Sequence, residues 1–380
     1  MKARGLVWRT GSFSLRLNPI SWATNALLAA SLMLLVFLGL RSGSLPLGPA
    51  TIANWLLFGN VGWTETVVLE NLRAPRLLLA VTSGGMLALA GGVTQHITRN
   101  GLADPSLIGV KAGAALCIVA LILAWPAAPL ALRPVVGLVG GLAAGLSVVL
   151  LARGASPLKF IMVGVGLSWC LSSMLVVMLT SADIRSLQRA MIWLAGSLEG
   201  ANWPTVQLAA AILSGSAIIL LSLARHAELE DMGDAKASAL GVRLSWVRIS
   251  CLVATVFLVA GAVSVAGGLG FVGLIAPHLA RILPRQDLRG RLISATLIGA
   301  LLVLAADLEA TVRALALEIA ANAPLSVAAA KKVIDEISRH PEQPDMAALD
   351  AVVMACFESD DYAEGRRAFL EKRKPEFKGK

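Results

Sequence analysis

Long apolar runs recur along the first four-fifths of this chain, and they constrain its fold more than any other feature. A helix needs about 20 apolar residues to cross the hydrocarbon core of a bilayer. Only 15% of the 380 residues are charged and 57% are hydrophobic, whereas about 25% of a soluble chain is charged. We therefore predict an all-α fold, a polytopic transmembrane helical bundle of about nine spans. The runs lie at about 25–40, 77–93, 107–124, 134–152, 160–180, 205–224, 248–267, 269–283 and 292–308.

The distribution of charge divides the chain into two predicted domains. Residues 1–308 carry a net charge of +11, and residues 309–380 carry a net charge of −2. The second stretch has closely spaced mixed charges and no apolar run long enough to span a bilayer. We predict a transmembrane domain over 1–308, followed by a small soluble helical tail over 309–380.

The basic residues of the first domain predict its orientation. With the N-terminus in the cytoplasm, fifteen Lys and Arg fall on the inner side and six on the outer side. This agrees with the excess of basic residues found in cytoplasmic loops. The basic N-terminus precedes an apolar run without a clear cleavage site, so we expect a retained first span. This placement of basic residues explains the net positive charge without a nucleic-acid partner.

The sequence contains no recognisable cluster of catalytic or metal-binding residues. The four cysteines and four histidines are scattered, without the spacing of a metal site. No G-x-x-x-x-G-K-[ST] phosphate loop occurs, so the chain is not itself an ATPase. We predict neither an enzyme nor a bound cofactor.

Four sequence blocks carry a family resemblance. They are residues 71–115, the WLAGSL segment at 193–198, the GDAKASALGV loop within 233–248, and GGLGFVGLIAPHLAR at 267–281. In this order and spacing they resemble the iron–siderophore and cobalamin ABC importer permeases of bacterial inner membranes. The resemblance implies an importer permease that pairs with a second permease copy, a separate ATPase subunit and a periplasmic substrate-binding protein. The 266–273 segment itself predicts a tight re-entry between two spans, because glycine relieves steric limits there.

Two arginines are the first candidate functional residues. Arg73 and Arg76 lie on the predicted outer face, against the general charge trend. Contact with lipid phosphate is one interpretation. The other is docking of carboxylates, with which guanidinium groups form paired hydrogen bonds. In the resembled family, arginines here receive acidic residues of the binding protein.

The loop at 225–248 is predicted to form two short helices that are interrupted at Gly233 and Gly241. It could be only a solvated connector, but the resemblance implies that it couples the permease to its ATPase. The residues expected to take part are Glu228, Asp231, Gly233, Asp234, Ala237, Leu240 and Gly241. The other signature residues are expected to have structural roles: Trp193, Gly196, Ser197, Gly270, Phe271, Gly273, Pro277, His278 and Arg281.

Four residues within or next to the predicted spans carry expectations of their own. Pro277 and His278 are expected to end a short span, with His278 bonding a freed carbonyl rather than binding a ligand. The family has proline where Gly101 stands, and a serine-type residue where Lys111 stands. An ammonium within a span costs roughly 2.5–3.5 kcal/mol unless it finds water or a partner. Lys111 is expected to lie near the inner boundary, where it could snorkel.

The tail departs from the permease family after residue 308, where a tenth span would be expected. Residues 314–335 and 357–379 instead resemble the C-terminal end of the enoyl-CoA hydratase/isomerase (crotonase) family. The part of that family that carries catalysis is missing, so no hydratase activity is expected. Three interpretations stay open: a permease for ferric siderophores, with catecholate types favoured by the RTGSFSLRLNP and LRSGSLPLG segments; a hydratase-related fragment; and a non-functional truncated permease fusion.

Overall fold

The structure, a computed structural model, divides into two compact units, Met1–Asp307 and Leu308–Lys380. Each is described by itself. The residues that the structure describes are 6–10, 13–17, 19–43, 45–59, 61–129, 131–152, 157–241, 243–284, 286–339 and 344–380.

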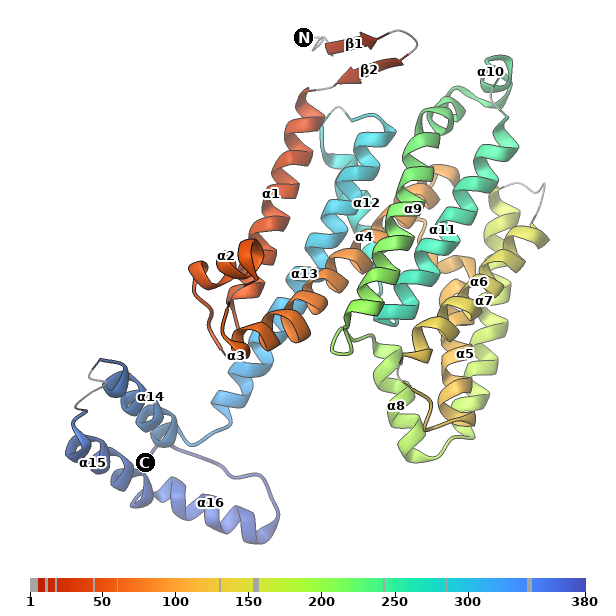
Figure 1. Cartoon of the computed structure of the whole chain (residues 1–380). Coiled ribbons are helices and arrows are strands. Elements are labelled where there is room, and N and C mark those ends of the chain that lie inside the picture. Colours follow the sequence, from red (N-terminus) through yellow and green to blue (C-terminus); the bar gives the residue numbers. More distant parts are fainter. Residues whose placement is uncertain are drawn as a thin grey trace. The chain divides into compact units, whose positions relative to one another are not determined.

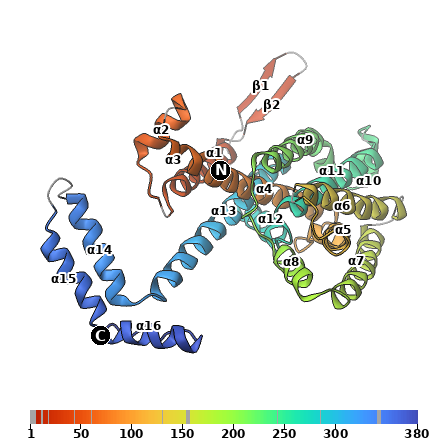
Figure 2. The same ribbon diagram turned by 60° about the horizontal axis from the view of Figure 1, so that its bottom comes forward.

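The first unit is a helical bundle, shown in Figure 1 and turned in Figure 2. Its long helices and the shorter α-helices among them are α1 (Pro19–Arg41), α2 (Pro49–Phe58), α3 (Trp63–Thr66), α4 (Ala74–Ile97), α5 (Val110–Ala124), α6 (Leu132–Leu151), α7 (Pro157–Thr180), α8 (Ile184–Ala195), α9 (Trp203–Glu228), α10 (Asp234–Ala239), α11 (Leu244–Ala266), α12 (Val272–Ile282) and the part of α13 (Leu288–Ala320) up to Asp307. A π-helical segment, η1 (Val67–Arg73), joins α3 to α4, and 3-10 turns form η2 (Pro105–Ile108) and η3 (Leu229–Met232).

Every predicted apolar run falls on a helix. Among the described residues, seven helices are long and apolar enough to cross a membrane: Pro19–Arg41, Trp63–Ile97, Leu132–Leu151, Met162–Thr180, Trp203–Glu228, Leu244–Ala266 and Leu288–Arg313. The runs at 107–124 and 269–283 fall on the shorter helices α5 and α12. Each short helix follows a non-helical turn within the bundle, so these two runs include backbone that is not α-helical. The fold is the predicted multi-span helical bundle.

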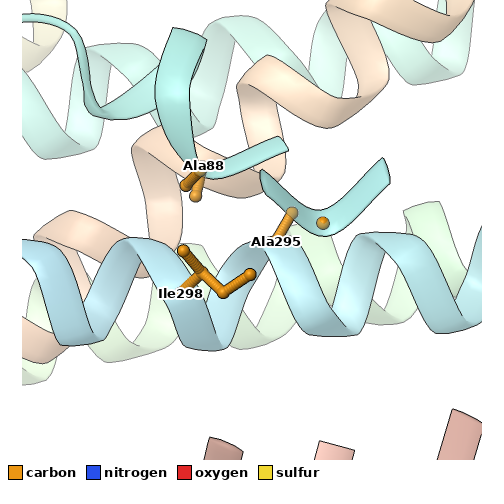
Figure 3. Packing of buried hydrophobic residues seen from close by; sticks show 5 residues of the cluster. Ala88, Ala295 and Ile298 are labelled. Atoms are coloured by element: carbon orange, nitrogen blue, oxygen red, sulfur yellow. The ribbon is translucent and has the colours of Figure 1, made fainter. Parts of the chain in front are cut away.

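Small residues allow α4 to lie at the centre of this bundle. It packs against α1, α9, α11 and α12. A β-carbon added at Gly299 of α13 would lie 2.5 Å from the carbonyl oxygen of Gly84, so these two helices touch through their backbones. Helices in lipid associate through such close packing, because the hydrophobic effect does not drive their apolar side chains together there. Figure 3 shows Ala88, Ala295 and Ile298 lying together where α4, α12 and α13 meet.

The sequence analysis missed a hairpin ahead of the first span. Strands β1 (Leu6–Thr10) and β2 (Phe13–Leu17) pair antiparallel, with Leu6 opposite Leu17. The alternation of apolar and polar residues from Phe13 to Leu17 is the signal that could have found it. The remaining described structure is helical or irregular, so the all-α class holds for the bundle.

The second unit contains α14 (Pro324–Arg339), α15 (Met346–Phe357) and α16 (Asp360–Glu371). α14 packs on α15, and α15 contacts α16. Between them lies an apolar groove of about 920 Å³, whose lining includes Phe357, Phe369 and Phe377.

An ion pair in this unit predicts a pH-dependent contact. Arg373 donates to both carboxylate oxygens of Glu364, at 2.5 and 3.1 Å. These bonds, and one from the backbone of Glu376, lower the pKa of Glu364 from 4.5 to about 2. A lowered folded-state pKa stabilises the fold above pH 4.5, and this stability is lost as the pH falls toward 2.

We therefore expect α16 to loosen between about pH 4.5 and pH 2. Tyr362 is the single tyrosine of the chain, and its ring packs edge-on against Phe357 at 5.1 Å. Fluorotyrosine would therefore give one ¹⁹F resonance that reports the α15–α16 contact. In Arg373→Gln the pKa of Glu364 should return toward 4.5, so the ¹⁹F signal should lose most of this acid dependence; an unchanged titration curve would contradict the assignment.

Candidate functional site

Two signature blocks meet at the turn between α11 and α12. The predicted re-entry is confirmed, since α11 ends at Ala266 and α12 begins at Val272. The backbone N–H of Ser197 donates to the carbonyl of Ala266 at 3.2 Å. Gly196 and Gly267 both have positive φ, and a β-carbon at Gly267 would lie 2.9 Å from the Cα of Gly196. The glycines of both blocks are therefore required by one close backbone contact.

The same turn supplies the partner of Lys111. The ammonium Nζ, on the first turn of α5, donates to the carbonyl oxygen of Gly268 at 3.0 Å. This carbonyl belongs to non-helical backbone, and buried backbone in a membrane must find an internal partner. The ammonium therefore has a hydrogen-bond partner within the bundle. Residues of three family blocks, at 111, 196–197 and 267–268, thus converge here.

Pro277 and His278 do not end their helix, contrary to expectation. Pro277 lies inside α12, which continues to Ile282. Proline cannot donate to the carbonyl four residues earlier, that of Gly273. Gly91 of α4 lies directly against that carbonyl, because a β-carbon there would collide with the oxygen of Gly273. Contact between the two helices therefore covers the carbonyl that the proline releases, and α12 runs on.

His278 does not have the role expected of it, and a polar contact to α12 comes instead from a residue that the sequence analysis did not single out. His278 is exposed, on a different side of α12 from the buried face formed by Gly273, Ala276, Pro277 and Ala280. The fully buried Gln95 of α4 instead donates to the carbonyl of Leu274 at 3.2 Å. Gln95 could have been suspected as a polar residue near the end of an apolar run.

Arg73 ends the π-helical segment η1, and its guanidinium has internal partners. The N–H of Ala74 donates to Leu69, five residues back, just before Pro75 interrupts the hydrogen-bond ladder. Arg73 donates to the carbonyls of Leu40 at 2.7 Å and Leu45 at 2.5 Å. It therefore ties the start of α4 to the end of α1.

Arg76 forms an ion pair with Asp307 of α13. Its Nε and Nη2 donate to the Asp307 carboxylate at distances of 2.8 to 3.1 Å. The Arg76 side chain is 33% exposed and that of Asp307 is 9% exposed. Arg73 and Arg76 thus have separate partners. The signal that could have identified Asp307 is its position as an ionisable residue at the end of an apolar run.

The loop expected to couple to an ATPase has the predicted form. η3 and α10 are separated by Gly233, and α10 is followed by Gly241, both glycines having positive φ. We call residues 229–240 the coupling segment. Ala237 is buried and Leu240 is 62% exposed, whereas the side chains of Asp231 and Asp234 are outside the described ones. The segment begins at the end of α9, immediately after Glu228.

The remaining signature residues have different surroundings. Phe271 has a φ of +64° and caps α12 with its ring exposed. Arg281 lies over Gly101, where a β-carbon would be 2.6 Å from its Nη1. The guanidinium therefore occupies room beside the position where the family has proline. Trp193 and Gly270 lie at the two meeting turns, one in the last turn of α8 and one before α12.

Comparison with known proteins decides the family. The FecCD transport family matches residues 31–330, which is most of the chain. The chain belongs to the FecCD transport family. It is accordingly a membrane transport permease of the ABC importer class, which works with an ATPase subunit and a substrate-binding protein, and it is not an enzyme.

FecCD permeases of several organisms are similar over most of their length. The achromobactin transport system permease protein CbrC of Dickeya dadantii is 34% identical over 311 residues, 80% of this chain and 87% of that protein. The Fe(3+) dicitrate permease protein FecD of Escherichia coli is 34% identical, covering 72% of this chain and 85% of that protein. The ferric enterobactin permease protein FepG of Escherichia coli is also 34% identical, over 71% and 82%.

A solved structure shares this FecCD fold. It is an inward-facing conformation of a metal-chelate type ABC transporter, 28% identical, with a TM-score of 0.67. The similarity covers 75% of this chain and 89% of that one.

The end of the chain also matches a second family. The enoyl-CoA hydratase/isomerase family matches residues 297–380. This overlaps the FecCD match over 297–330, and the single helix α13 runs through the expected boundary at 308. The two matches therefore meet within continuous helix rather than at a linker.

Proposed function

We propose that this chain is the permease subunit of a bacterial importer of ferric siderophores. The observation that carries the proposal is the FecCD match, together with relatives whose names refer to achromobactin, ferric dicitrate and enterobactin. The finer assignment, a catecholate siderophore, is supported by the N-terminal RTGSFSLRLNP and LRSGSLPLG segments.

The permease is proposed to lie in the bacterial inner membrane with its N-terminus in the cytoplasm. The excess of basic residues on that side supports this orientation. It places η3 and α10 in the cytoplasm, where the coupling segment would contact an ATPase subunit. A second permease copy would complete the translocation path.

Arg73 and Arg76 are proposed to help position the outer surface for a periplasmic binding protein. Their guanidinium groups hold α1, α4 and α13 together through Leu40, Leu45 and Asp307. In this proposal they order the docking surface, at which the Arg76 side chain is 33% exposed.

The C-terminal domain, residues 309–380, is proposed to be a crotonase-derived fragment fused to the permease. The match over 297–380 supports this origin. No hydratase activity is proposed for it. A fusion that has lost transport altogether is the alternative.

Uptake of radioactive iron tests the proposed function. Cells whose only permease copy is this chain, supplied with the ATPase and binding protein of its operon, should accumulate ferric catecholate above an empty-vector control. Ferric citrate and ferric hydroxamate serve as competing substrates. No uptake of any chelate, with the protein present in the membrane, would support a permease that the fusion has inactivated.

A further inference from the structure

The first turn of the coupling segment is held by side chains of two other helices. Glu230 of η3 is 6% exposed as a residue. Its carboxylate Oε2 accepts from Nε of Arg248, on the first turns of α11, at 3.1 Å. A carboxylate as deeply buried as this one needs a charged partner. This contact fixes η3 to the start of α11.

The backbone of the same residue is held by α4. Arg99 Nη2 donates to the carbonyl oxygen of Glu230 at 2.8 Å. In the last turn of α4, just before Arg99, Nε2 of His96 lies 3.1 Å from the carbonyl oxygen of Ala227, at the end of α9. The end of α4 therefore contacts two successive parts of the chain that leads into the coupling segment.

Arg99 is held in a backbone conformation that favours glycine. Its φ is +50°, in the left-handed region. This conformation costs free energy for residues other than glycine, and strained backbone of this kind clusters at functional sites. Here the left-handed residue follows the end of α4, and its guanidinium reaches η3.

We propose that Arg99, Glu230 and Arg248 form a clamp that transmits movement of the coupling segment to α4 and α11. α4 contacts α9, α11 and α12, so displacement of its end reaches the centre of the bundle. The inference rests on the proposed function, because it takes the coupling segment as the ATPase contact. Arg99 and Glu230 are positioning residues in this scheme and touch no substrate.

Arg99→Gly tests the clamp while keeping the backbone conformation. Glycine adopts the positive φ at least as readily as arginine, so the variant loses the side chain with its guanidinium contacts and adds no backbone strain. Lys372→Gly is the matched control, since Lys372 is also a basic residue with positive φ, +54°, after the end of a helix. It lies in the second unit and takes no part in the clamp.

Two measurements decide the inference. Hydrogen exchange of the purified full chain should show the amides of 229–240 exchanging about tenfold faster in Arg99→Gly, because a charge-assisted bond is lost. In proteoliposomes with the ATPase and binding protein, iron imported per ATP hydrolysed should fall about tenfold, while ATP hydrolysis and complex assembly persist. Lys372→Gly should match the wild type in both.

Unchanged exchange in the coupling segment would overturn the clamp. Normal import per ATP by Arg99→Gly would overturn its role in transmission. If the wild-type complex itself imports no iron, the proposed function fails, and the exchange measurement alone then decides whether the clamp exists.

Discussion

Gly91→Leu should lower the free energy of unfolding by about 3 kcal/mol, because overpacking a tight backbone contact forces helices apart. A β-carbon at Gly91 would collide with the carbonyl oxygen of Gly273. The backbone atoms of Gly273 cannot rotate out of the way of an added side chain, as another side chain could. Separation of α4 from α12 would also uncover the Gly273 carbonyl, which Pro277 leaves without its helical donor.

The matched control is Gly215→Leu in α9. No atom lies within 4 Å of a β-carbon at that position, and the residue is exposed. The substitution should be neutral or slightly stabilising, since glycine is unfavourable within a helix. Unfolding of the purified protein by increasing SDS fraction measures both variants. Equal stability of Gly91→Leu and Gly215→Leu would show that α4 and α12 are not in backbone contact.

Arg76→Met should cost about 2 kcal/mol of stability, somewhat below the usual value for breaking a buried ion pair. The reduction is expected because the Arg76 side chain is 33% exposed. The Asp307 carboxylate, 9% exposed, would be left without its guanidinium partner. Adding Asp307→Leu should recover most of the loss, since replacing both charges by apolar groups is often neutral.

The same pair of variants separates a structural role from docking. Affinity for the binding protein is measured with the complex in nanodiscs. If Arg76 itself receives a carboxylate of the partner, affinity should stay low in the double variant although stability returns. If Arg76 only orders α4 against α13, affinity should return with stability. Full stability in Arg76→Met alone would refute the ion pair.

The sequence by itself determined the helical bundle and its class. A span is a local property, because about 20 consecutive apolar residues suffice to cross lipid whatever surrounds them. The nine apolar runs therefore all fall on helices. The glycine breaks at 233 and 241 were also readable, because positive φ is a local demand of the backbone.

Only the tertiary structure decided which polar groups are paired. Arg76 and Asp307 are 231 residues apart, and Lys111 and Gly268 are 157 apart. No spacing in the sequence encodes such contacts, since they depend on which helices pack together. The expected helix end at Pro277 was wrong for the same reason. Proline's local preference is to end a helix, but α12 continues to Ile282 where it packs against Gly91 and Gln95 of α4.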